Sequence, residues 1–145
     1  MDWIYEIKDD LRSYAARKAS IKNVADELER LQAELYGIKS ATADGTPVSG
    51  GTNRREDRLL NIIAKKRKLE DAQKCTRDWV SIMDRALAEL SAEEFELLDR
   101  LYIHGSRGSA DRIAEEMGVE IRTVWRQSRS ALVHLAYAMY GQLMS

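Results

Sequence analysis

Three arginines stand at helical spacing near the carboxy-terminal end of the chain. Arg122, Arg126 and Arg129 are four and three residues apart, so a helix would place them on one face. A guanidinium group donates two parallel hydrogen bonds to a guanine edge or grips a phosphate, and a lysine ammonium lacks that geometry. This chemistry fits contact with nucleic acid, but an arginine stripe on a helix is by itself more often a solvated face. Only a helix-turn-helix around the stripe would favour DNA contact.

The residues around these arginines have the apolar spacing of an amphipathic helix. At about 100° per residue, the arginines cluster well away from the centre of the apolar arc. Trp125 lies at the boundary, where an indole either caps the core or touches DNA. The buried arc is expected to consist of Val124, Ser128, Ala131, Leu132 and Leu135.

Two shorter helices are expected before this one. Ser91 and Glu94 form a capping box that starts a helix, and Gly105 ends it. Ser109 is expected to be the N-cap of the next helix, which ends at Gly118 because glycine accepts the left-handed conformation. A short helix, a glycine turn and a longer helix with arginines are typical of a helix-turn-helix, whose second helix enters the major groove.

Two long segments precede this module, separated by SATADGTPVSGGT at residues 40–52, which holds the only proline and three glycines. On both sides apolar residues alternate spacings of three and four, which predicts two long helices in an all-α protein. Matched arms with one flexible connector predict an antiparallel hairpin over residues 1–90, followed by the helix-turn-helix domain at 91–145. The expected register pairs Trp3 with Leu90, Tyr14 with Trp79, and Leu31 with Ile62.

A second apolar stripe flanks the seam of the expected hairpin. Two helices alone cannot bury it, so either the carboxy-terminal module or a second subunit should cover it. We therefore expect a homodimer. The residues expected at this oligomerisation surface are Leu60, Ile63, Trp79 and Ile82.

Residues 109–135, SADRIAEEMGVEIRTVWRQSRSALVHL, resemble the promoter-reading region 4 of bacterial sigma factors, whose helix-turn-helix has a pattern of the type EIAEELGVSxxTVxxxxxxALxxL. Together with the two arms and the connector, the chain resembles phage and prophage late-gene regulators of the ArpU and RinA type. This resemblance implies a transcription regulator that binds double-stranded DNA, with a hairpin that mediates either dimerisation or contact with bacterial RNA polymerase.

In sigma-like modules the base-reading residues lie on the first turns of the last helix. Glu120 departs from the usual Ser or Thr cap, and two apolar residues stand where polar ones commonly read bases, so the target sequence does not transfer. The residues that correspond to the base-reading positions are Ile121, Arg122, Trp125 and Arg126, with Arg129 one turn further.

The resemblance also implies contacts to the DNA backbone at the start of the scaffolding helix. Ser109 would present backbone amides to a phosphate there. Arg107 and Arg112 would assist it.

The composition narrows the classes of protein to which this chain can belong. A charged fraction of 32% with a net charge of −1 excludes a global polyelectrolyte, so nucleic-acid binding must come from local charge. A single cysteine, Cys75, excludes an internal disulfide framework, and no apolar run is long enough for a bilayer. The acidic amino-terminal residues do not fit a signal peptide, so a cytoplasmic protein without membrane contact is expected.

No catalytic machinery is visible in the sequence. The two histidines and the cysteine lack metal-ligand spacing, and no nucleophile, general base or phosphate loop accompanies the paired carboxylates. We expect no enzyme activity, no metal and no cofactor. Two functions stay open: a transcription regulator, and a DNA-packaging subunit resembling phage small terminases, which also combine helix-turn-helix modules with helical hairpins.

Overall fold

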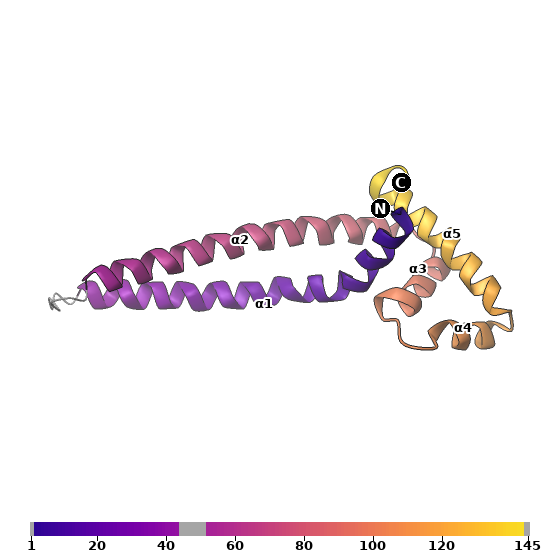
Figure 1. The fold of residues 1–145 in the computed structure, drawn as a ribbon, viewed down its shortest axis with the longest axis horizontal. Coiled ribbons are helices and arrows are strands. Elements are labelled where there is room, and N and C mark those ends of the chain that lie inside the picture. Colours follow the sequence, from indigo (N-terminus) through magenta and orange to yellow (C-terminus); the bar gives the residue numbers. More distant parts are fainter. Residues whose placement is uncertain (1, 44–51, 144–145) are drawn as a thin grey trace. The chain divides into compact units, whose positions relative to one another are not determined.

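The computed structural model describes residues 2–43 and 52–143, and these residues form helices without any strand (Figure 1). The prediction of an all-α protein is therefore confirmed. The elements are α1 (Trp3–Ala43), α2 (Thr52–Ala88), α3 (Ala92–Leu98), a π-helical segment η1 (Asp99–Ile103), α4 (Ser109–Met117) and α5 (Ile121–Tyr140). Both ends of the expected connector, residues 40–43 and 52, are helical, and residues 44–51 of the connector lie outside the described residues.

The chain divides into two compact units, and the division differs from the one expected at residue 90. The helix-turn-helix unit comprises residues 1–17 and 79–145, and the hairpin unit comprises residues 18–78. The start of α1 and the end of α2 belong to the helix-turn-helix unit because their apolar side chains share its core. Ile7 and Met83, for example, are completely buried in the same cluster as Leu135 of α5.

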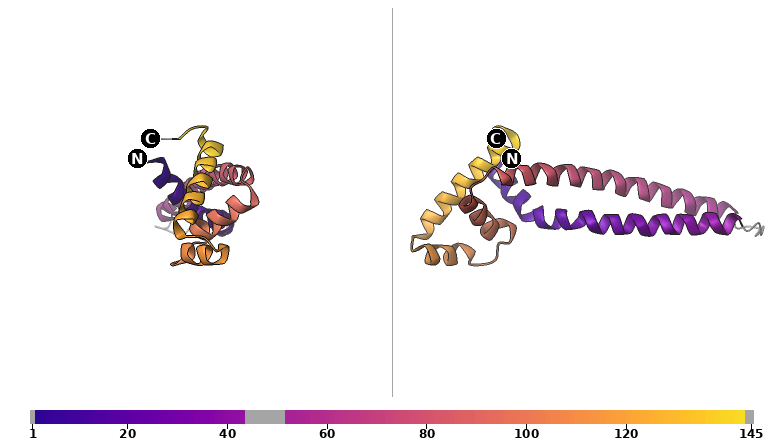
Figure 2. Two further views of the ribbon diagram at one scale, coloured as in Figure 1. Left: turned by 90° about the vertical axis from the view of Figure 1, so that its right-hand side faces the viewer. Right: turned by 180° about the vertical axis from the view of Figure 1, so that it is seen from behind.

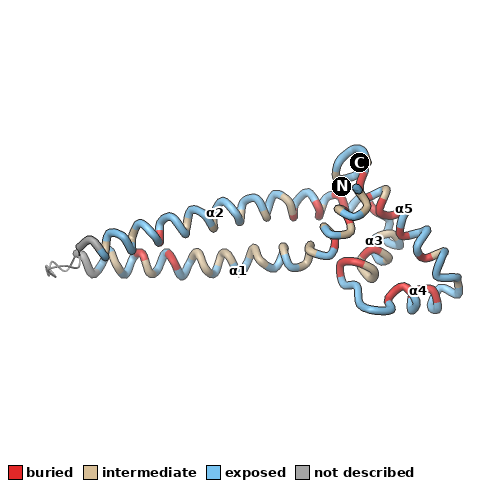
Figure 3. Tube along the Cα trace, viewed as in Figure 1, coloured by how far each residue is buried: buried red, intermediate tan, exposed pale blue. Residues whose placement is uncertain are grey.

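The main core of the helix-turn-helix unit is built from all parts of that unit except α4. Figure 3 shows buried positions on each contributing element. The expected contact of Tyr14 with Trp79 is confirmed, with ring centroids 6.4 Å apart. The buried residues are Ile7, Leu11, Met83, Ala86, Leu87, Leu90, Leu98, Tyr102, Ile103, Ala131, Leu132, Leu135 and Ala136.

In the hairpin unit, α1 and α2 run side by side in opposite directions (Figure 2). Leu31 and Leu35 of α1 are buried with Ile62 of α2, which confirms the expected meeting of Leu31 with Ile62. Further along the seam, the amide of Gln73 donates a hydrogen bond to the carbonyl oxygen of Ile21 at 3.0 Å. A polar side chain at the seam is thus bonded across it, which fixes the register of the pair.

The segment from Ser91 to Gly105 begins as expected and ends differently. The capping box is confirmed: the Glu94 amide donates to the Ser91 hydroxyl at 3.1 Å, and the Ser91 amide donates to the Glu94 carboxylate at 3.0 Å. The helix then widens into η1, where the His104 amide donates to the carbonyl of Asp99 at 2.7 Å. The chain turns away after Ile103, and Gly105 is needed because a Cβ there would lie 2.2 Å from the carbonyl oxygen of Leu101.

Candidate nucleic-acid interface

The turn between α4 and α5 is a Schellman motif. Gly118 has a φ of 67° and its amide donates to Glu115 at 3.2 Å, while the Val119 amide donates to the carbonyl of Ala114 at 3.0 Å. These bonds satisfy the last carbonyls of α4. The prediction that Gly118 ends this helix in the left-handed conformation is confirmed.

A small core beneath this turn fixes α4 against the first half of α5. Val124 is completely buried there, and Ile113 almost so. Leu97 and Leu101 of the preceding segments pack against them, as does Val119 of the turn. The start of α5 is therefore held by apolar contacts on one side only.

The second half of α5 is anchored in the main core of the unit. Leu132 and Leu135 are buried among residues of α1, α2, α3 and η1. At the end of the helix, the Tyr140 hydroxyl donates to the Asp10 carboxylate at 2.9 Å. Burial raises the pKa of Asp10 and, with the hydrogen bond, raises the pKa of Tyr140 to about 12. Figure 1 shows the resulting course of α5, from the turn after α4 back to the amino-terminal end of α1.

The exposed face of the first half of α5 contains the expected base-reading residues. Ile121 is 41% exposed and Trp125 is 46% exposed. The indole of Trp125 is therefore partly buried against the protein and partly open to solvent. Arg122 and Arg126 are both exposed. Among the described residues Arg122 has no hydrogen-bond or ion-pair partner, and Arg126 reaches only the Thr123 hydroxyl at 3.4 Å. Neither guanidinium is neutralised within the described chain.

Arg129 differs from the two arginines before it. Its guanidinium lies over the ring of Trp3 in α1, with 5.7 Å between the guanidinium carbon and the ring centroid. This cation–π contact partly orients the side chain. The stripe expected from the spacing is therefore divided into two unneutralised arginines and one that lies against α1.

The amino-terminal end of α5 has no side-chain cap. Glu120 occupies the N-cap position with extended backbone, and its carboxylate makes no capping hydrogen bond. The first amides of a helix without a side-chain cap are available to water or to an anion. The departure of Glu120 from the Ser or Thr of sigma-like modules thus leaves this helix end open.

The start of α4 corrects the prediction for Ser109. The N-cap is Gly108, not Ser109, and Ser109 is buried. Its amide and hydroxyl both donate to the carbonyl of Ser106, at 3.1 and 2.8 Å, and the hydroxyl accepts the Ser106 amide at 3.0 Å. Ser109 therefore closes the turn that precedes α4, and its own amide is occupied.

Arg112 holds the same turn from outside. It donates to the Ser106 hydroxyl at 2.7 Å and to the carbonyl of Arg107 at 3.3 Å. Arg107 itself is exposed on the turn. Both arginines expected near a phosphate are therefore exposed. Arg112 differs from Arg107 in that its guanidinium also stabilises the turn.

An ion pair that the sequence analysis missed fastens α4 to η1. Arg100 donates to both carboxylate oxygens of Glu116, at 2.6 and 3.1 Å. The hydrogen bonds from this guanidinium lower the pKa of Glu116. A similar contact joins α5 to α3, where His134 lies 3.1 Å from Glu94. Partners this far apart in the chain give no periodic signal in the sequence.

The four residues expected at the oligomerisation surface belong to different units. Leu60 and Ile63 are in the hairpin unit, 63% and 43% exposed. Trp79 and Ile82 are in the helix-turn-helix unit, where Trp79 is half-buried with the Arg17 guanidinium over its ring at 4.1 Å. The Trp79 ring thus packs against side chains of its own chain.

No candidate metal centre and no candidate membrane span lies in the described part of the chain. No group of three or more histidine, cysteine, aspartate or glutamate side chains there could hold a metal ion. None of the described helices has the length and apolar character needed to span a bilayer. Comparisons with protein-family models, with curated proteins and with solved structures give no match.

Proposed function

We propose that the protein is a DNA-binding transcription regulator that reads a promoter with the exposed first half of α5. The observation that carries the proposal is the pair Arg122 and Arg126, unneutralised and exposed at the start of a helix that follows a Schellman turn. A helix presented in this way fits the major groove, where arginine pairs with the O6 and N7 atoms of guanine.

Each neighbouring residue has a role in this proposal. Ile121 and Trp125 would make apolar contacts with thymine methyl groups or sugars, since both are half-exposed beside the arginines. Arg107 and Arg129 would contact phosphates on either side of the groove. The uncapped amides after Glu120 would donate hydrogen bonds to a phosphate as well.

The resemblance to sigma region 4 and to regulators of the ArpU and RinA type extends the proposal to phage or prophage late genes. Acidic residues surround the arginines, so one copy of the module would bind DNA weakly and salt would suppress binding strongly. A homodimer, or contact with RNA polymerase, would supply the missing affinity. The protein would act in the cytoplasm, where such promoters lie.

Selection of duplexes from a random library by the full-length chain tests the proposal. A preferred sequence should emerge, and Arg126→Ala should weaken binding to it by about 1–3 kcal/mol while changing binding to random duplex little. Arg85→Ala, which removes the same charge from an exposed position on α2, serves as the matched control. No enrichment, or equal losses in both variants, would contradict base reading by α5.

The same preparation separates regulation from DNA packaging. A small-terminase-like subunit would assemble into a closed ring, whereas the regulator proposed here would form a dimer. The mass of the full-length protein in solution therefore decides between them.

A further inference from the structure

The face of α2 that flanks the hairpin seam contains two exposed aliphatic residues. Leu60 and Ile63 are 63% and 43% exposed, whereas Ile62 between them is buried against α1. Glu56 and Arg67 are exposed on the same face. At about 100° per residue, these four residues lie within about 60° of one another around the helix.

The two charged residues of this face have no ion-pair partner among the residues that the structure describes. Among the described residues, Lys65, Lys66 and Arg58 on other faces of α2 take part in ion pairs, and Glu56 and Arg67 do not. They are also eleven residues apart, or about 16 Å along the helix, so they cannot reach one another.

The order of these residues is symmetric in spacing and complementary in charge. Along the chain they read Glu56, Leu60, Ile63 and Arg67, with intervals of four, three and four residues. A two-fold axis between residues 61 and 62 would bring Leu60 of one copy beside Ile63 of the other. The same axis would bring each Glu56 beside an Arg67.

We propose that this face of α2 is an isologous interface with a second copy of the chain, in which the two α2 helices pack antiparallel. A two-fold interface requires one surface that is complementary to itself, and a central apolar pair flanked by opposite charges meets that requirement. Flanking charges of this kind set the partner and the orientation of paired helices. The apolar contact is small, so the charge pairs decide the orientation.

This interface replaces the four-residue oligomerisation surface expected from the sequence with a narrower one. Trp79 makes contacts within its own chain, and Leu60 and Ile63 remain exposed in the hairpin unit. The inference does not rest on DNA binding, because association is measured without DNA.

The test uses sedimentation equilibrium of the full-length chain at low ionic strength. The unchanged protein should form a dimer. Glu56→Arg and Arg67→Glu should each weaken dimerisation by about tenfold, because each places two pairs of like charges across the axis. Glu56→Arg combined with Arg67→Glu in one chain should restore it.

Mixing the two single variants gives a sharper result. In the mixed dimer every Arg faces a Glu, so Glu56→Arg and Arg67→Glu chains should associate with each other more tightly than either does with itself. Lys68→Glu makes the same charge change about 100° further round the helix and should leave the dimer unchanged. Rescue by the second charge reversal also excludes loss of folding as the cause.

A protein that stays monomeric at its highest soluble concentration would overturn the proposal. So would a dimer that is insensitive to Glu56→Arg, or one that Arg67→Glu fails to rescue.

Discussion

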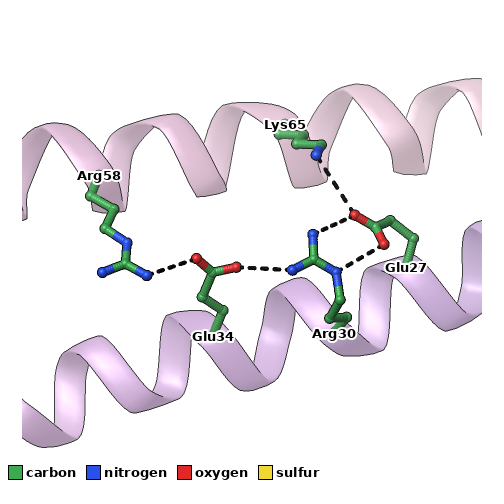
Figure 4. A network of polar contacts seen from close by, with 5 residues as sticks. All are labelled: Glu27, Arg30, Glu34, Arg58 and Lys65. Atoms are coloured by element: carbon green, nitrogen blue, oxygen red, sulfur yellow. Dashed lines mark hydrogen bonds and ion pairs between the residues drawn. The ribbon is translucent and has the colours of Figure 1, made fainter.

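Arg30 and Arg58 of the hairpin unit and Arg122 and Arg126 of α5 have opposite surroundings. In the hairpin unit, Arg30 donates to Glu27 at 2.7 Å and Arg58 donates to Glu34 at 3.0 Å (Figure 4). On α5, Arg122 and Arg126 have no carboxylate partner among the described residues. Arginine therefore helps to join two helices in the hairpin unit, whereas on α5 its guanidinium stays available for an external acceptor. A missing carboxylate partner therefore distinguishes Arg122 and Arg126 from Arg30 and Arg58, and the number of arginines does not.

The charges of the network in Figure 4 are paired with one another. The hydrogen bonds from Arg30 lower the pKa of Glu27, and Lys65 approaches the same carboxylate at 3.7 Å. A DNA phosphate would have to displace these carboxylates before it could bind there. At the start of α5 a phosphate or a base edge meets no such competitor.

The availability of the α5 arginines depends on the core that holds the helix, and removing that support has the largest expected effect. Leu135 is completely buried, so Leu135→Ala should lower the free energy of unfolding of the helix-turn-helix unit by about 2–5 kcal/mol. Urea unfolding measures this loss, with Val133→Ala, at a position on the same helix that is only partly buried, as a control of similar chemistry. A loss below about 1 kcal/mol would mean that α5 is not anchored as described.

Two glycines sharpen the comparison between the units. Gly105→Ala places a Cβ 2.2 Å from the carbonyl oxygen of Leu101, so the helix-turn-helix unit should lose about 1–3 kcal/mol of stability. Gly37 lies within α1 with open space around it, so Gly37→Ala should stabilise the hairpin unit by about 1 kcal/mol. Thermal unfolding of both variants measures the two changes in stability. Changes of the same sign would contradict the different roles given to Gly105 and Gly37.

Local patterns predicted the local structure well. The Ser91 and Glu94 capping box, the left-handed Gly118 and the buried arc around Val124 were all predicted, because each depends on residues within a few positions of one another. The hairpin contacts followed from matched periodic arms. The exposed, unneutralised state of Arg122 and Arg126 agrees with their calculated position on the helix.

Polar and cation–π contacts between distant residues were not predicted. The contact of Arg129 with Trp3 and the ion pair of Arg100 with Glu116 join elements far apart in the chain. One local prediction was also wrong: Ser109 was expected as an N-cap, but Gly108 takes that position and the serine hydroxyl donates back to the carbonyl of Ser106. Serine is favoured both at N-caps and in turns, so the residue type alone does not distinguish the two roles. The course of the backbone decides which role the side chain takes.

The contact at the end of α5 gives a smaller effect that depends on pH. The pKa of Tyr140 is raised to about 12 from an ordinary value near 10, mainly by burial. A raised pKa means that the neutral hydroxyl stabilises the fold fully below pH 10, and that this contribution is lost as the pH rises towards 12. The stability difference between the unchanged protein and Tyr140→Phe should therefore shrink over this interval. A constant difference would place Tyr140 outside the anchor.

The most direct test of the central claim compares two pairs of arginines in the full-length chain. Arg122→Ala with Arg126→Ala and Arg30→Ala with Arg58→Ala remove equal charge, the first from the open face of α5 and the second from the paired network of the hairpin unit. Fluorescence anisotropy with the selected duplex, over a range of salt concentrations, measures the affinity of each. We expect the α5 variant to lose at least tenfold, about 1.4 kcal/mol, and the hairpin variant to bind like the unchanged protein. Equal losses in both variants, or none in the α5 variant, would contradict the assignment of α5 as the DNA-reading helix.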